Sequence, residues 1–258
     1  MSDADIEFAH ALADAAAAIS VERFRGGDWT VETKPDGSPV TDVDRQVETK
    51  LREMIGERFP TDAVVGEEYG GEAGDGRAWY LDPIDGTANF CEGIDRWSTL
   101  VALAEGGTVR VGVVDLPMHG RRVWAGTGTG AFDGTAPLHV STVGELSHST
   151  ICDDYRGHIE RRVADHPLVH LAAVGGAVLP HRGHSTLAVA SGRAEVALAT
   201  SGGPWDYAPF VAVIREAGGR TSDVLGVDRF DGRTLLSTNG RVHEEALAVV
   251  QQSALPGR

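Results

Sequence analysis

Apolar residues recur at helical spacing near the start of the chain. An amphipathic first helix is predicted from the apolar positions Ile6, Leu12, Ala13, Ala16, Ile19 and Phe24. A second helix is predicted between Thr41 and Phe59, where apolar residues stand four apart at Val43, Val47, Leu51 and Ile55. Each pattern indicates a helix that buries one face against the rest of the domain.

Strand-forming runs separated by turn residues occupy the middle of the chain. Strands are predicted at 99–104, 109–116 and 122–125, with turns at 105–107 and 118–120. Glycines at 126, 128 and 130 follow the third run and lead into Ala131 and Phe132. Because no helix pattern follows them, these glycines indicate a hairpin and not a nucleotide-binding loop.

Helical patterns return in the second half. An apolar run at 207–217 follows Trp205 and Asp206 and ends at two glycines, and 246–250 is predicted to be a packing helix. The segment 138–149 is rich in Ser, Thr and His and is the best boundary between two halves. We therefore predict a single domain over residues 1–258, with an N-terminal half of about 1–140 and a C-terminal half of about 141–258.

Composition and charge limit the classes of partner. The chain has 258 residues, of which 41% are hydrophobic and 24% charged, and this is typical of a globular protein with a substantial core. Its formal net charge of −15 argues against nucleic acid or an anionic membrane as a partner. An anionic substrate would need bound cations to neutralise its site.

Cysteine usage and hydropathy suggest a location. Cys91 and Cys152 are too few for a disulfide framework, and Cys91 is expected to be structural. The sequence shows no signal-peptide pattern and no long apolar run. We expect a cytoplasmic protein without a membrane span.

The strongest chemical signal is a pair of carboxylates three residues apart, at Asp82 and Asp85. Apolar residues at 79–81 precede them like the end of a buried strand, and Pro83 fixes the backbone between them. We interpret the segment as a turn across which both carboxylates converge, with the Ile84 carbonyl between them. Oxygen ligands of this kind suit Mg²⁺.

Gly86 and Thr87 follow at what is predicted to be a helix start, where free N–H groups can hold a phosphate oxygen. The alternative is structural, because Asp-Pro and Asp-Gly are ordinary turn dipeptides and most such turns bind nothing.

Other acidic residues stand where they could reach the same cleft. Glu67 and Glu68 follow an apolar pair and a glycine, and Asp206 opens the helical run at 207–217. Asp44 ends a polar loop that begins at Lys34 and runs into the second helix. Each has a structural alternative: Asp206 as a helix cap, and the loop as a solvated segment with a capping Thr41 or Asp42.

Together, these segments resemble the inositol monophosphatase family, the lithium-sensitive Mg²⁺-dependent phosphomonoesterases. The matching segments are the loop at Lys34, Gly66-Glu67-Glu68, Asp82-Pro83-Ile84-Asp85-Gly86-Thr87, Trp205-Asp206 and Ala217-Gly218-Gly219. The resemblance spans most of the chain and implies an α+β fold, the layered α/β/α/β/α sandwich shared with fructose bisphosphatase. It implies hydrolysis of a small phosphate monoester by a metal-activated water, and we also expect a homodimer.

The resemblance also assigns roles to residues. It implies two or three Mg²⁺ ions held by Glu67, Asp82, the Ile84 carbonyl, Asp85 and Asp206. Thr87, hydrogen-bonded to Asp44, is similar to the family's water-orienting pair, and Glu68 to its second acid, which supports a further metal through water. The N–H groups of Gly86 and Thr87 would bind phosphate, and Asp85 would also contact substrate.

The substrate-selecting region departs from the family pattern. Seven positions before the metal-binding Asp206, the family carries a Glu that binds substrate hydroxyls or an amine, but this chain has Ala199. His181, Arg182 and His184 occupy the region of the family's substrate loop. Arg182 and His184 are therefore predicted to contact substrate, for example a second anionic group.

Several functions are compatible with these features. The leading expectation is a Mg²⁺-dependent phosphatase of a polyol or sugar phosphate, of the inositol-1-phosphate class. The alternatives are a histidinol-phosphate phosphatase, a fructose bisphosphatase, a 3′-phosphoadenosine phosphatase, and a metal- and phosphate-binding module without turnover. Such a module needs no water-orienting hydroxyl, so the pairing of Thr87 with Asp44 favours an enzyme.

Overall fold

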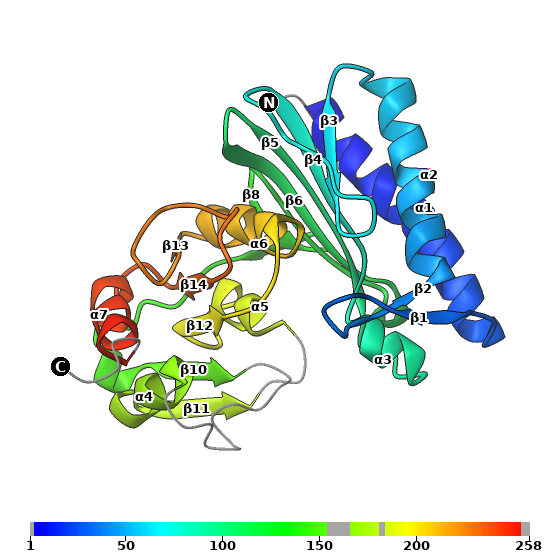
Figure 1. Ribbon diagram of the computed structural model, residues 1–258. Helices are drawn as coiled ribbons and strands as arrows, with labels where there is room; N and C mark the ends of the chain where they lie inside the picture. Colours follow the sequence, from blue (N-terminus) through cyan, green and yellow to red (C-terminus); the bar gives the residue numbers. More distant parts are fainter. Residues whose placement is uncertain (1–2, 154–165, 181–183, 254–258) are drawn as a thin grey trace.

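Helices and sheets alternate in five stacked layers (Figure 1). The computed structural model describes residues 3–153, 166–180 and 184–253. The first layer holds α1 (Asp3–Gly26) and α2 (Asp42–Arg58). The second is a seven-stranded sheet with the spatial order β3 (Ala63–Gly66), β4 (Arg77–Asp85), β5 (Ser98–Glu105), β6 (Thr108–Leu116), β7 (Arg121–Gly126), β8 (Gly130–Asp133) and β9 (Ala136–Leu138).

The remaining layers come mainly from the second half. The middle layer holds α5 (Ser185–Ala190) and α6 (Pro204–Glu216). Next is a five-stranded sheet with the order β11 (Ala177–Pro180), β10 (Thr150–Asp153), β12 (Val196–Ala199), β14 (Leu235–Thr238) and β13 (Arg220–Ser222). The last layer holds α4 (Pro167–Val174) and α7 (His243–Ser253). The predicted α/β/α/β/α sandwich is confirmed.

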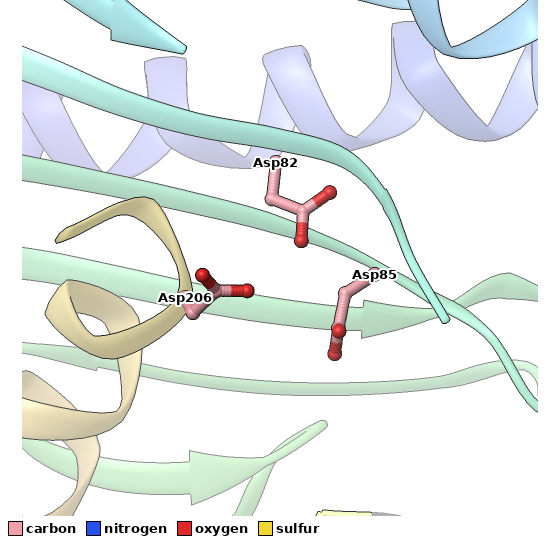
Figure 2. A group of neighbouring side chains, drawn as sticks. All are labelled: Asp82, Asp85 and Asp206. Atoms are coloured by element: carbon pink, nitrogen blue, oxygen red, sulfur yellow. The ribbon is translucent and has the colours of Figure 1, made fainter. Parts of the chain in front are cut away.

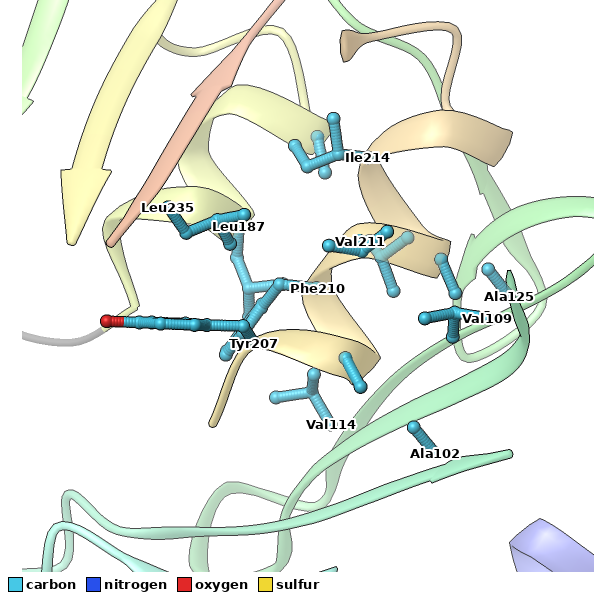
Figure 3. Close-up of a cluster of buried hydrophobic side chains, with 14 of the residues drawn as sticks. Ala102, Val109, Val114, Ala125, Leu187, Tyr207, Phe210, Val211, Ile214 and Leu235 are labelled. Atoms are coloured by element: carbon cyan, nitrogen blue, oxygen red, sulfur yellow. The ribbon is translucent and has the colours of Figure 1, made fainter. Parts of the chain in front are cut away.

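Three apolar cores separate these layers. Successive residues of β5 point to opposite faces, so Leu100 and Ala102 enter the middle core while Val101 and Leu103 pack under α1 and α2. In the middle core, α6 inserts Phe210 and its apolar neighbours between the two sheets (Figure 3). Because β5 is buried on both faces, its sequence does not alternate between apolar and polar residues but is largely apolar over 99–104.

One glycine allows α6 to lie close to the first sheet. A Cβ on Gly112 of β6 would lie 2.4 Å from the backbone oxygen of Pro209, in the middle of α6. The absence of a side chain there lets the helix backbone rest directly on the strand. This close packing fixes the height of α6, and so of Asp206 in its first turn, above the sheet.

Most elements predicted for the first half are confirmed. The two helices, the three strands and the hairpin after β7 are present, with β7 and β8 paired through Gly126 and Gly130. The helix at 207–217 begins earlier than predicted, at Pro204, and the C-terminal packing helix is α7. Cys91 is a free thiol. Among the helices of the described residues, none is long and apolar enough to cross a membrane.

His243, at the start of α7, should make stability depend on pH. Its fully buried ring lies 3.1 Å from the Ser222 hydroxyl and 3.0 Å from that of Thr238. Burial and the nearby charge of Arg220 lower its pKa from 6.5 to about 4, so the folded protein holds it neutral. Protonation of the unfolded chain should therefore remove stability as the pH falls from 6.5 towards 4, by about 1.4 kcal/mol per pH unit.

Urea unfolding of wild type and His243→Gln between pH 7 and pH 5 measures this contribution. The variant should be less stable at pH 7 but should lose less stability on acidification, since glutamine does not titrate. His119→Gln, at an exposed position, is the matched control and should keep the wild-type slope. Equal slopes for all three proteins would contradict the assignment.

Candidate active site and metal centre

The site lies at the carboxyl ends of two strands of the first sheet. Strands β3 and β4 are parallel, so their carboxyl ends lie together. Glu67 and Glu68 follow the end of β3, while Asp82 and Asp85 lie in the last part of β4. The Glu67 amide donates to the Leu81 carbonyl at 3.1 Å, which ties the glutamates to β4.

A bulge in β4 turns both aspartates towards the same side. Asp82 pairs with Leu100 and Asp85 with Ser98, so Pro83 and Ile84 together face the single residue Thr99. In a regular strand, residues three apart point to opposite faces, and the extra residue corrects this. The sequence-based interpretation of a turn after residue 81 was therefore wrong, because β4 continues to Asp85, but the expected convergence occurs.

Asp206 completes a cluster of three carboxylates (Figure 2). One ligand oxygen from each of Asp82, Asp85 and Asp206 lies within 4.8 Å of the others. Asp206 belongs to the first turn of α6, where its Oδ2 accepts the Gly203 amide at 2.5 Å. Since a carboxylate has two oxygens, Asp206 can cap its helix with Oδ2 and have its other oxygen available for a cation. The capping and metal-binding interpretations are thus compatible.

The electrostatics of the cluster favour a cation. Burial, with the charges of Glu67, Asp85 and Asp206, raises the pKa of Asp82 well above its usual value. Burial and the Asp85 charge likewise raise the pKa of Asp206 to about 8. Oδ1 of Asp82 is buried and has no hydrogen-bond partner among the described residues. An unpartnered oxygen within a set of hard oxygen donors fits a divalent metal such as Mg²⁺.

Lys34 contacts the two glutamates beside this cluster. It lies in the turn between β1 (Val31–Thr33) and β2 (Pro39–Thr41), and its Nζ is 2.8 Å from Glu67 Oε1 and 2.9 Å from Glu68 Oε1. Burial raises the pKa of Glu68 to about 7, although the ammonium opposes this shift.

Sequence reasoning gave Lys34 no role, and the composition offers only a weak signal. The chain has only two lysines, Lys34 and Lys50, and uses arginine for its other permanent positive charges. Rarity alone does not distinguish Lys34 from Lys50, an exposed residue of α2 that lies 3.9 Å from Glu53, so only the fold reveals the contact with the two glutamates.

Thr87 and Asp44 lie close together beside the end of β4. The Thr87 hydroxyl lies 3.3 Å from Asp44 Oδ1 and 2.9 Å from the Ile84 carbonyl. With one hydrogen, it shares its donation between these acceptors. Oδ2 of Asp44 accepts from the Thr41 amide and hydroxyl, which closes a capping box at the start of α2. Asp44 is thus held by its own helix while one oxygen faces Thr87.

Gly86 allows the sharp change from β4 to α3 (Thr87–Cys91). Its φ of +93° is a conformation that other residues rarely adopt, and an added Cβ would lie 3.1 Å from the Arg96 carbonyl. The chain therefore turns from strand to helix within one residue. This places the N–H groups at the start of α3 directly after Asp85, where the sequence predicts phosphate binding.

His184 is the substrate-region residue that the structure places. Its Nε2 lies 2.8 Å from the Ser98 hydroxyl and its Nδ1 3.4 Å from Asp85 Oδ2. The ring thus bridges the start of α5 to the metal-site strands, and burial lowers its pKa. Its contact with Ser98 was not foreseen. His181 and Arg182 lie outside the described residues, so their predicted roles stay predictions.

Ala199 is the last residue of β12. Because β12 and β11 are both parallel to β10, the carboxyl ends of these three strands lie at the same end of the second sheet. The methyl group of Ala199 packs against the middle core. The side chain offers no hydrogen-bond acceptor, so substrate groups near this strand end must find partners elsewhere.

Comparison with known proteins identifies the family. Residues 1–255 match the sequence profile of the inositol monophosphatase family. The histidinol-phosphatase of Mycobacterium tuberculosis is 41% identical over 96% of this chain and 98% of its own length, and that of Streptomyces coelicolor is 35% identical over 96% and 97%. The structure of a Thermotoga maritima IMPase superposes with a TM-score of 0.81 at 27% identity, covering 98% of each chain.

Fold, acidic cluster and relatives agree: the chain belongs to the inositol monophosphatase family and is one of its phosphomonoesterases.

Proposed function

We propose that this enzyme hydrolyses histidinol phosphate to histidinol and inorganic phosphate. The observation that carries the proposal is the 41% identity, over nearly the whole of both chains, to a protein named histidinol-phosphatase. Two further relatives with that name are 34% and 35% identical, whereas an inositol-1-monophosphatase of Synechocystis is 32% identical over a smaller part of this chain. These relatives favour the histidinol alternative over the inositol or sugar phosphate expected first.

The acidic cluster is proposed to hold two or three Mg²⁺ ions. The ligands would be Glu67, Asp82, the Ile84 carbonyl, Asp85 and Asp206. When bound, the ions supply positive charge that stabilises the phosphate oxygens and lowers the pKa of the attacking water. The Ile84 carbonyl has two lone pairs, so it can accept the Thr87 hydroxyl and still bind a cation. Glu68 is proposed to support a further ion through an intervening water.

The remaining groups orient the reactants. The Thr87 hydroxyl and Asp44 are proposed to position the attacking water, because the capping box holds Asp44 rigidly while one oxygen faces Thr87. The N–H groups of Gly86 and Thr87 are proposed to bind phosphate oxygens at the start of α3. Neither the Thr87 hydroxyl nor the Asp44 carboxylate is a strong base, so this pair contributes by orienting the water.

The substrate's amine must be recognised without an acid at position 199. Asp85 is proposed to contact the substrate, and its Oδ2 already faces the Ser98 hydroxyl and His184. Arg182 and His184 are proposed to line the same region. A carboxylate supported by neutral donors can accept hydrogen bonds from an ammonium or a hydroxyl group.

The metal ligands can be tested at Asp82. Asp82→Asn keeps the side-chain shape but removes a charge from a site that must gather cations, so kcat/KM should fall roughly 10²-fold or more. Excess EDTA should abolish wild-type activity, and Mg²⁺ should restore it. Asp62→Asn is the control, because this aspartate pairs with Arg77 at the opposite end of β4 and should leave activity in place. Full activity in excess EDTA would refute the metal assignment.

The water-orienting role can be tested at Thr87. Thr87→Ala should leave Mn²⁺ binding nearly unchanged while kcat and kcat/KM fall together, by roughly 10²-fold, since only positioning in the transition state is lost. Thr87→Ser keeps the hydroxyl and should retain much more activity. A rise in KM with unchanged kcat would instead make Thr87 a substrate contact.

The substrate is tested by phosphate release with Mg²⁺ present. We expect kcat/KM for histidinol phosphate to exceed that for inositol 1-phosphate and for sugar mono- and bisphosphates by at least roughly tenfold, since a site that hydrogen-bonds its substrate discriminates strongly. Arg182→Ala and His184→Ala should reduce this ratio. Equal turnover of all substrates, or a preference for a bisphosphate that Arg182→Ala removes, would refute histidinol phosphate while leaving the phosphatase assignment intact.

A further inference from the structure

A buried carboxylate outside the proposed ligand set supports the loop that carries Glu67 and Glu68. Glu48 lies one helical turn after Asp44 on α2, and its side chain is fully buried. Its Oε2 accepts the Glu68 amide at 2.8 Å, and its Oε1 accepts the Tyr69 amide at 3.3 Å. The carboxylate therefore binds the backbone directly after Glu67.

Arg52 donates hydrogen bonds to backbone carbonyls of the same loop. Its Nε lies 2.8 Å from Glu48 Oε1, while its two terminal nitrogens donate to the Gly70 carbonyl at 2.5 Å and to the Val64 carbonyl at 3.4 Å. The loop also closes on itself, because Gly66 and Gly70 exchange two backbone hydrogen bonds of 3.0 Å. The Glu48–Arg52 pair thus contacts donors and acceptors on both sides of the two glutamates.

The close approach of Glu48 to the loop depends on a glycine at position 66. A Cβ on Gly66 would lie 2.0 Å from Glu48 Oε1, so only glycine leaves room for the carboxylate. Because Asp44 and Glu48 are four residues apart, they share one face of α2. This face therefore fixes both the partner of Thr87 and the loop that carries Glu67.

We propose that Glu48, supported by Arg52, is a positioning residue that sets where the Glu67 carboxylate lies and thereby the affinity of the site for Mg²⁺. The inference rests on the proposed function, which makes Glu67 a metal ligand. Groups that orient metal ligands by hydrogen bonding typically change metal affinity or activity 10–100-fold when mutated. Glu48 would act through the backbone at Glu68 and Tyr69 without touching metal or substrate.

The test is Glu48→Gln, which keeps the shape but replaces one acceptor oxygen with an NH₂ group that faces another donor. Mn²⁺ binding to the substrate-free protein, followed by electron paramagnetic resonance, should weaken roughly 10-fold or more. The Mg²⁺ concentration for half-maximal activity should rise in parallel, while kcat at saturating Mg²⁺ stays close to wild type.

Glu195→Gln is the matched control. Glu195 is also a buried glutamate that accepts a backbone amide, that of Thr150 at 2.6 Å, but it lies directly before β12 of the second sheet. Its variant should keep the wild-type Mn²⁺ affinity, whatever its loss of thermal stability. Arg52→Lys, which removes the planar fork from a partly exposed side chain, should weaken Mn²⁺ binding in the same direction and covers the case in which Glu48→Gln does not fold.

Two outcomes would overturn the inference. Unchanged Mn²⁺ affinity in Glu48→Gln, or equal weakening in Glu48→Gln and Glu195→Gln, would make Glu48 a purely structural residue. These results differ from failure of the metal assignment itself, in which Asp82→Asn would bind Mn²⁺ as well as wild type does.

Discussion

Mutual repulsion among three closely spaced carboxylates is the constraint on which the rest of this site depends. Asp82, Asp85 and Asp206 come within a few ångströms of one another, with 4.8 Å as the limit between their ligand oxygens. Burial and the neighbouring charges raise the pKa values of Asp82 and Asp206, and a bound cation would relieve this repulsion. The bulge in β4 and the capped start of α6 place the three aspartates together, and Lys34 pairs with the two neighbouring glutamates.

Local patterns predicted what depends on local sequence. The spacing of apolar residues indicated α1 and α2, and the paired aspartates indicated a metal site, because helix amphipathicity and ligand type are read within a few positions. The resemblance then supplied the layer order and brought distant Asp206 to the site. Without it, nothing near residue 206 distinguishes a ligand from a helix cap.

The parts that sequence reasoning missed depend on register and long-range packing. The bulge at Pro83 arises from pairing with Thr99 on another strand, so the segment alone resembles a turn. Likewise, Lys34 and the buried Glu48 are ordinary polar residues until the fold brings each to Glu68. Tertiary contacts, and not residue type, gave these side chains their place.

The origin of Asp206 on α6, while its partners lie on β4, links ligand binding to the assembly of the molecule. A cation bound by all three carboxylates would link α6, in the middle layer, to the first sheet. It would bind the form in which α6 is docked on the sheet more tightly than a form in which α6 has separated from it. By mass action, such a ligand stabilises the assembled form in proportion to RT ln(1 + [L]/Kd). A cation bound by all three carboxylates would therefore also hold α6 against the first sheet, and a lower supply of the ion would weaken this contact.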